Sequence, residues 1–281
     1  MELNFKIKDK SEKSLKLRKS YLSNFKKKGF PNKKLEGWKF TDLEKVLKDN
    51  FKELNNKKYE NKKPKIQNFR FNHNSIILIN GKLESFDFKP ENFVNKNYLS
   101  IKELELDHHL NFANESDNNS MQNLNTALLE GGFCLNIFPD YKLKHPIVIY
   151  NYFCGKFKNK MINNSEIINI SRNSNATIIE YLIDESDGSF FKNTFKYLNL
   201  EENSSLNYFF INKNESGNFF YEFSKAVLSK NSNFKKYLFS SGIKFSKSDN
   251  NIKLDGENSS SEVYSGLFLG KNCHQEIKTN V

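Results

Sequence analysis

The second half of the chain is a succession of short apolar or alternating runs separated by polar turns. From Phe133 onward the runs read FCLNIF, PIVIYNYF, EIINI, ATIIEYLI, LNYFFI, FYEFSKAVL, FKKYLF and SEVYSGLFL. Runs of this length, bounded by Asn, Ser, Lys and Gly, are typical of β-strands. Because no long stretch with a helical period interrupts them, the pattern predicts an all-β region over 133–281.

An Asn-Ser pair precedes four of these runs at nearly constant spacing. The pairs are Asn173-Ser174, Asn203-Ser204, Asn231-Ser232 and Asn258-Ser259, at intervals of 30, 28 and 27 residues. This repeat is shorter than the roughly 40–45 residues of a propeller blade. It fits a β-solenoid, in which corresponding turns stack from coil to coil. Since Asn tolerates left-handed backbone angles, we expect each pair at one corner of a coil.

The first half mixes helical and extended patterns. Leu15, Leu22 and Phe25 share one face of a predicted helix over 11–29, which Gly29 ends. The remaining segments are predicted as a loose connector over 52–66, a hairpin over 75–86, a loop with a short helix over 90–119, and a short helix over 121–132. The Asn80-Gly81 step marks the turn of the hairpin.

A second helix is predicted directly after Thr41. Glu44 follows Thr41 by three residues, which is the spacing of a capping box. Trp38 and Phe40 lead into this cap, and we expect both to anchor the segment on the body of the protein.

Composition narrows the possible classes of protein. Aromatic residues reach 14%, with 27 Phe, so global disorder is excluded although the mean hydropathy is −0.71. The net charge is +11, but arginine occurs only at Arg18, Arg70 and Arg172. Because arginine is the preferred ligand for phosphates and guanine edges, we interpret the lysines as a solvated surface and expect neither nucleic acid nor membrane as a partner.

Few residues in the chain suggest chemistry. Cys134 is interpreted as a core residue and His108-His109 as solvated. Cys273 and His274 are weak metal-ligand candidates, since no second cluster of ligands supports them. The sequence contains no phosphate-binding loop, no GxSxG, no HExxH and no paired CxxC. The cysteine usage and the lack of an apolar leader predict a cytoplasmic protein.

The sequence features described so far are also compatible with two other functions. A β-solenoid enzyme that acts on polysaccharide would need clustered acidic groups, and the cluster Asp184, Glu185 and Asp187 reads better as a loop. A basic interaction module would need a contiguous lysine stripe with interleaved aromatic residues.

Three segments, in chain order, resemble the SufD family of iron–sulfur cluster assembly proteins. The first is FPNKKLEGWKFTDLEKV (30–46), in which Pro31, Glu36, Trp38, Lys39, Phe40, Thr41 and Leu43 stand at the positions of a family phrase. The others are TALLEGGFCLNIFPDYKLKHPIVI (126–149) and IKLDGENSSSEVYSGLFLGKNCHQEIKTNV (252–281). The phrase around Trp38 indicates SufD rather than its paralogue SufB.

The resemblance implies a fold and a role. The fold is a helical N-terminal region with a hairpin (1–125), followed by a right-handed parallel β-helix (126–281). The role is that of a scaffold subunit that pairs with a SufB-like paralogue and a SufC-like ATPase. On this basis we expect no enzymatic activity, no catalytic residue and no cofactor held by the chain itself, while the complex handles the iron–sulfur cluster.

The chain departs from the family pattern at its end. Family members continue with more β-helix, a histidine implicated in cluster assembly and a helical region that docks SufC, whereas this sequence stops at Val281. No residue here takes the role of that histidine. The sequence is therefore expected to be truncated, to have lost direct SufC docking and to self-associate through an uncovered solenoid end.

Overall fold

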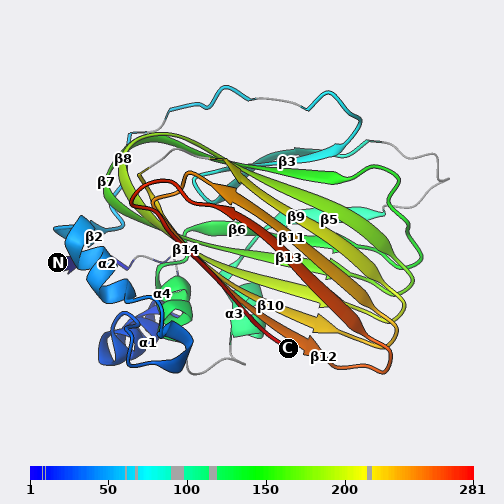
Figure 1. Ribbon diagram of the computed structural model, residues 1–281, viewed down its shortest axis with the longest axis horizontal. Coiled ribbons are helices and arrows are strands. Elements are labelled where there is room, and N and C mark those ends of the chain that lie inside the picture. Colours follow the sequence, from blue (N-terminus) through cyan, green and yellow to red (C-terminus); the bar gives the residue numbers. More distant parts are fainter. Residues whose placement is uncertain are drawn as a thin grey trace.

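Parallel strands stacked rung upon rung form the larger part of the molecule (Figure 1). The computed structural model describes residues 1–7, 9, 11–60, 62–66, 69–89, 98–113, 119–213 and 217–281. The strands of the stack are β7 (Ile147–Ile170), β8 (Asn175–Leu200), β9 (Ser205–Lys213), β10 (Phe219–Leu228), β11 (Asn233–Ser241), β12 (Phe245–Leu254), β13 (Ser260–Phe268) and β14 (His274–Asn280). Their parallel pairing over about five turns confirms the predicted β-solenoid.

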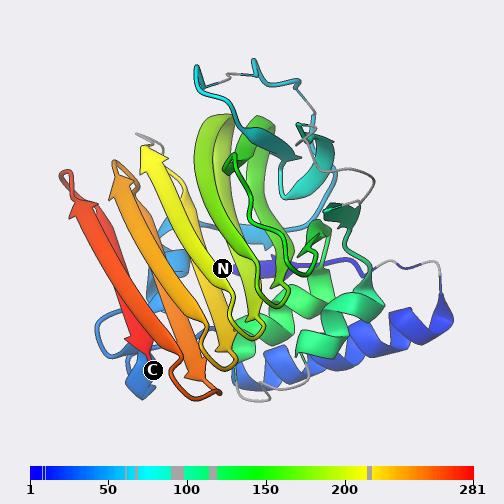
Figure 2. The same ribbon diagram turned by 90° about the vertical axis from the view of Figure 1, so that its right-hand side faces the viewer.

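Each coil contributes one segment to each of two walls. The outer wall contains residues 147–157 of β7 and 175–188 of β8, followed by β9, β11 and β13. The helix-side wall contains the later parts of β7 and β8, followed by β10, β12 and β14. β7 and β8 therefore run through both walls as long bent strands, and helices lie against the second wall (Figure 2).

The Asn-Ser pairs occupy one corner of the coil, as predicted. Asn173, Asn203, Asn231 and Asn258 have positive φ angles of 58°, 56°, 55° and 57°. Each of their side-chain amides donates to the oxygen of the equivalent residue one coil earlier, over 2.7–3.3 Å. The first acceptor is Asp140, which also has a positive φ of 64°. Asp140 is followed by Tyr141, so the Asn-Ser repeat does not include this first corner, although Asp140 takes the same place in the ladder.

A tight bend forms the opposite corner in β8. Gly188 has a φ of 97°, and a Cβ atom at this position would lie 2.0 Å from the carbonyl oxygen of Phe157. Only glycine fits such a close approach of two backbones.

The N-terminal region contains four α-helices and six strands within the described residues. They are β1 (Glu2–Asn4), α1 (Glu12–Lys28), α2 (Leu43–Asn50), β2 (Glu53–Asn55), β3 (Asn74–Ile79), β4 (Lys82–Asp87), β5 (Leu99–Glu103), α3 (Leu106–Ala113), α4 (Ser120–Leu128) and β6 (Gly131–Ile137), with a short 3-10 turn at Glu36–Trp38. Helix α1, helix α4 and the hairpin of β3 and β4 confirm the sequence predictions. The predicted short helix within 90–119 is α3, while 90–97 and 114–118 lie outside the described residues.

Two predictions for this region are wrong. The cap of α2 is Asp42, whose carboxylate accepts from the amide of Lys45 over 2.9 Å, and not Thr41. Thr41 instead faces the last rung of the solenoid. The connector over 52–66 contains strand β2, which pairs in parallel with β1 and extends the sheet toward β7.

Two apolar cores hold the layers together. One occupies the part of the space between the two walls that lies toward the Asn-Ser corner, and it includes Ile149, Ile178 and Leu200. The other lies between the helix-side wall and the helices and includes Leu47, Leu124, Phe195 and Phe223. None of the helices in the described part of the chain is both long and apolar enough to cross a bilayer.

Candidate functional site

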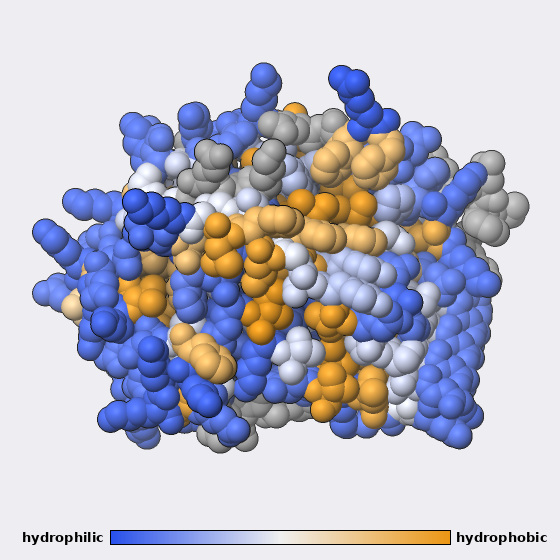
Figure 3. Space-filling model, in the orientation of Figure 1, coloured by the Kyte–Doolittle hydropathy of each residue, from blue (hydrophilic) through white to orange (hydrophobic). Residues whose placement is uncertain are grey.

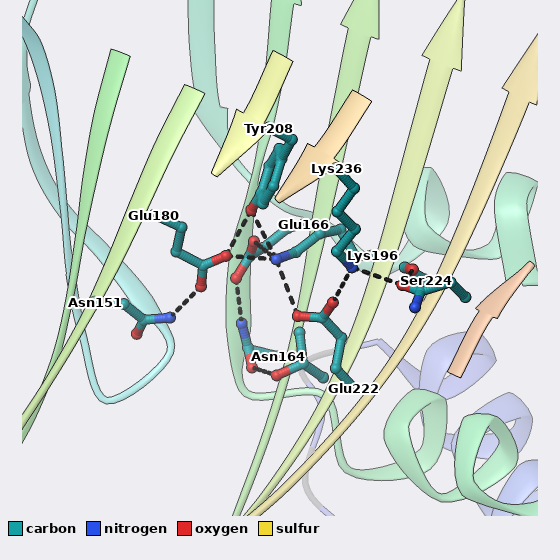
Figure 4. A network of polar contacts seen from close by, with 11 residues as sticks. Asn151, Asn164, Glu166, Glu180, Lys196, Tyr208, Glu222, Ser224 and Lys236 are labelled. Carbon is teal, nitrogen blue, oxygen red and sulfur yellow. Dashed lines mark hydrogen bonds and ion pairs between the residues drawn. The ribbon is translucent and has the colours of Figure 1, made fainter. Parts of the chain in front are cut away.

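Charged residues occupy the interior of the solenoid between its apolar ends. Because side chains alternate along a strand, every second residue of each wall points inward. On the helix-side wall the inward positions include Glu166, Lys196 and Glu222, and on the outer wall they include Glu180 and Lys236. With Tyr208, these residues form the interior cluster shown in Figure 4.

Lys196 lies at the centre of the interior cluster. Its ammonium nitrogen lies 2.5 Å from Glu180 Oε2, 3.1 Å from Glu222 Oε2 and 3.3 Å from Glu166 Oε2. It also donates to the hydroxyl of Tyr208 over 2.8 Å, and that hydroxyl donates to Glu180 over 2.5 Å. The lysine therefore links both walls across the interior.

A second lysine extends the cluster toward the later rungs. Lys236 donates to Glu222 Oε1 over 2.9 Å and to Asn250 Oδ1 over 2.7 Å. The hydroxyl of Ser224 donates to the same Asn250 oxygen over 2.8 Å. The polar contacts thus connect four successive strands of the helix-side wall to the outer wall.

Amides complete the shell of the cluster at the earlier rungs. Asn151 donates to Glu180 Oε1 over 3.0 Å, and Asn164 donates to Glu166 Oε1 over 3.2 Å. Glu166 Oε2 is close enough to Lys196 for an ion pair but accepts no hydrogen bond within the described structure.

Burial and neighbouring charges shift the pKa values of these groups, and the direction of the shift differs from group to group. Burial alone would raise the pKa of Glu180 and Glu222, but nearby lysines outweigh it, so both pKa values are lowered. Burial and the charge of Glu180 raise the pKa of Glu166. Burial opposes the charge on Lys196, yet the three carboxylates outweigh it and raise its pKa. Glu166 is therefore the carboxyl group of the cluster that protonates most readily.

One further lysine lies beside the cluster without a direct partner. Lys192 is 4% exposed, and its ammonium lies 5.2 Å from the centre of the Phe153 ring. It makes no hydrogen bond or ion pair to any described residue, and burial lowers its pKa. Together, Lys192, Lys196 and Lys236 match the three carboxylates in number. The arrangement is suited to holding two walls together, since its charges compensate one another away from solvent.

The two metal-ligand candidates from the sequence do not converge. His274, at the start of β14, points to the helix side, where its ring stacks on Phe245 at 5.5 Å. Its Nε2 lies 2.7 Å from the hydroxyl of Thr41, which also donates to Glu276. Cys273 lies in the preceding turn, with Sγ 3.8 Å from the carbonyl oxygen of Lys271. Within the described ranges, no group of three metal-ligating side chains occurs here or elsewhere.

The other cysteines are separate from the interior cluster. Cys134 is buried on β6, as expected of a core residue, and Cys154 is fully buried with its thiol donating to the carbonyl of Lys62 over 2.9 Å. Burial raises the pKa of both thiols. Such thiols are poor nucleophiles because the reactive form is the thiolate.

The prediction that His109 is solvated is wrong. Its ring is fully buried where α3 packs on α4, and its Nε2 lies 2.8 Å from the hydroxyl of Thr126. The side chain of His108 lies outside the described residues.

The acidic segment predicted as a loop also differs from its prediction. Asp184, Glu185 and Asp187 belong to β8, just before the bend at Gly188. The carboxylate of Asp184 accepts hydrogen bonds from the hydroxyl of Ser186 and from the side-chain amide of Asn218. These bonds stabilise the bend, so this carboxylate has a structural role.

Two family models match successive parts of the chain. The model described as the SufBD protein N-terminal region matches residues 3–149, which is about half of the chain. The model described as the SufBD core domain of SUF system FeS cluster assembly matches residues 153–281. The chain belongs to the SufB/SufD family. Among curated proteins, the comparison found no match to it.

The segment around Trp38 holds the N-terminal region of this SufB/SufD protein against its solenoid. The Trp38 ring lies 5.3 Å from the ring of Tyr221, and the ammonium of Lys247 lies 4.7 Å from its centre. Trp38 is buried, as predicted, but Phe40 is 72% exposed and anchors nothing. Three successive strands of the helix-side wall, β10, β12 and β14, thus receive this segment through Tyr221, Lys247 and His274.

The interior cluster of this family member was not predicted from the sequence. A signal was present, because Glu180 and Lys236 interrupt apolar runs at positions whose neighbours two residues away are inward-facing. To use that signal, one must know which alternate residues of each strand point inward, and the repeat alone does not give this.

Proposed function

We propose that this chain is a SufD-type scaffold subunit without catalytic turnover. Membership of the SufB/SufD family assigns it to the SUF system of iron–sulfur cluster assembly. Within that system, we propose that it pairs with a SufB-like paralogue, in a complex that also contains a SufC-like ATPase. The observation that carries the proposal is the match of both family regions, in order, over nearly the whole chain.

The phrase around Trp38 supports the SufD type. The interior cluster supports a scaffold role, because its charged groups, apart from the partly exposed Glu222, are buried, ion pairs link its carboxylates to lysines, and no cysteine lies among them. All three cysteines are free, which fits a reducing compartment such as the cytoplasm.

Co-expression tests the pairing directly. An affinity-tagged copy of this chain is purified from cells that also produce a SufB-like protein and a SufC-like ATPase. We expect the SufB-like protein to be retained at a stoichiometric level and the ATPase to be retained with it. Recovery of the tagged chain alone, in a folded state by circular dichroism, would contradict the proposal.

We also propose that the last rung is a contact surface. Among the described strands, β13 and β14 each pair on one side only. Near them, Tyr264, Phe268 and Leu269 are 49%, 64% and 57% exposed. Hydrophobic side chains gather on the face of the molecule where these last strands lie (Figure 3). An unpaired strand edge beside apolar side chains favours association, so light scattering should show oligomers of the isolated chain. A monomer at all concentrations would count against this proposal.

A further inference from the structure

A basic cleft lies where the N-terminal region meets the first coil of the solenoid. It comprises a hollow of about 410 Å³ and an adjoining hollow of about 250 Å³, which share Lys57, Lys58, Tyr59 and Lys160. Lys6 and Lys82 line the larger hollow and Lys158 lines the smaller. Small-molecule sites commonly occupy 300–1,000 Å³, so the cleft has the size of such a site.

Positive charge in the cleft exceeds the negative charge that faces it. Lys6, Lys58, Lys82 and Lys158 are exposed, and none of them has a carboxylate within ion-pair distance among the described residues. Lys57 lies 3.9 Å from Glu53, and Lys160 lies 2.6 Å from Glu130. Since concave walls focus the field of like charges, the cleft attracts anions.

Hydrogen bonds fix the walls of this cleft. The side chain of Asn56 accepts from the amide of Lys6 and donates to its carbonyl, both over 2.8 Å. Arg18 donates to the carbonyls of Ala127 and Leu129 over 3.3 and 3.0 Å, which holds the end of α4 as the floor. The site is therefore largely formed before a ligand binds.

The cleft also has an apolar part. The half-buried ring of Tyr59 packs edge-on against Phe157 at 4.8 Å, and the ammonium of Lys160 lies 5.5 Å from the ring centre. Ile7 is half-buried on the same lining. A ligand that carries a planar ring next to anionic groups matches this mixed lining.

We propose that the basic cleft binds a phosphate-bearing small molecule of the nucleoside diphosphate class. Lys58, Lys82 and Lys158 contact the phosphates as point charges, and the base lies toward Tyr59 and Ile7. The chain has no phosphate-binding loop motif, so we expect lysine side chains rather than a glycine-rich loop to hold the phosphates.

Two features favour a small molecule over nucleic acid. Arg18 is the one arginine on the lining, and it is already engaged by Asp9 and by the carbonyls of α4. Among the described residues, Tyr59 is the one aromatic residue on the lining of either hollow, whereas single-stranded nucleic acid is bound by several stacking rings along a groove.

Calorimetric titration of ADP into the full chain tests the proposal. The test variant carries Lys58→Glu and Lys158→Glu. The control variant carries Lys230→Glu and Lys271→Glu, which changes the net charge equally at two exposed positions away from the cleft. We expect ADP affinity to fall at least about tenfold in the test variant and to change less than about twofold in the control. Circular dichroism and thermal melts verify that both variants are folded.

Other outcomes overturn the proposal. These are the absence of ADP binding to the unmodified chain at millimolar concentration, or equal losses in the two variants. If pyrophosphate binds as tightly as ADP, the base does not contact Tyr59 and Ile7 as proposed. A single-stranded oligonucleotide that binds more tightly than ADP, and loses binding in the test variant only, assigns the cleft to nucleic acid instead.

Discussion

Replacing the central lysine of the interior cluster tests whether its charges hold the solenoid together. Lys196→Met keeps most of the side-chain volume but removes a cation that lies within 3.3 Å of three carboxylates. Lys196 is fully buried, and so are Glu166 and Glu180. The substitution therefore leaves buried negative charge without its main partner.

Removal of one partner from a buried ion pair costs about 3–5 kcal/mol of unfolding free energy. For a chain of this size, that loss corresponds to a fall in melting temperature of roughly 6–20 °C. The matched control is Lys235→Met, which removes the ion pair of Lys235 with Glu262, whose side chains are 34% and 40% exposed on the outer face of the solenoid. We expect the control to melt within error of the unmodified chain, because exposed pairs contribute little.

The pH dependence gives a second readout of the same substitution. In the unmodified chain the lowered pKa values of Glu180 and Glu222 contribute stability above their unfolded values, and this is lost as the pH falls through the folded values. In Lys196→Met the same carboxyl groups lose the cation, so their folded pKa values rise. The gap between the two proteins should therefore be largest at neutral pH and should narrow in acid.

Urea denaturation followed by far-ultraviolet circular dichroism measures both effects. If Lys196→Met is no less stable than Lys235→Met at pH 7, the cluster does not hold the walls together. A gap in stability that widens in acid would equally refute the electrostatic reasoning.

Substitutions at three further positions test other parts of the structure. Asn231→Ala should cost about 1–2 kcal/mol in urea denaturation, because alanine is strained at its positive φ, and Asn231→Gly should cost less; equal costs would contradict this. Trp38→Ala should cost about 3–5 kcal/mol by removing the buried contact with Tyr221 and Lys247, and a loss below about 1 kcal/mol would show that the segment is not anchored there. Burial, aided by the charge of Arg18, lowers the pKa of His109 to about 3. Because the unfolded chain takes up a proton below about pH 6.5 and the folded chain does not, stability should fall by about 1.4 kcal/mol per pH unit between pH 6.5 and 3. His109→Gln should lack this component, and an unchanged slope would contradict it.

The corner turns could be predicted because they depend on local chemistry. A left-handed residue such as Asn203 is needed at each corner whatever lies around it, so the requirement repeats in the sequence. The same holds for the helix ended by Gly29 and for the hairpin at Asn80-Gly81.

The contacts between distant segments could not be predicted in the same way. Thr41 and Asp42 are both capable of capping a helix. The hydroxyl of Thr41 does not cap because it is hydrogen-bonded to His274 and Glu276, which lie more than 230 residues later in the chain. Likewise, Lys196 meets Glu166 only because β7 and β8 stack in register. Local spacing indicates which residues are able to cap a helix or form an ion pair. The stacking of coils decides which of these residues come into contact.

The scaffold proposal is tested most directly by measuring iron–sulfur cluster formation with a variant of this chain that has no cysteine. The variant carries Cys134→Ala, Cys154→Ala and Cys273→Ser, which removes all three thiols. The complex with a SufB-like protein and a SufC-like ATPase is reconstituted with this variant and with the unmodified chain, and the initial rate of iron–sulfur cluster formation is followed by absorbance. The account predicts equal rates at equal amounts of assembled complex. A complex that assembles normally but no longer builds clusters would show that a thiol of this chain takes part in the chemistry.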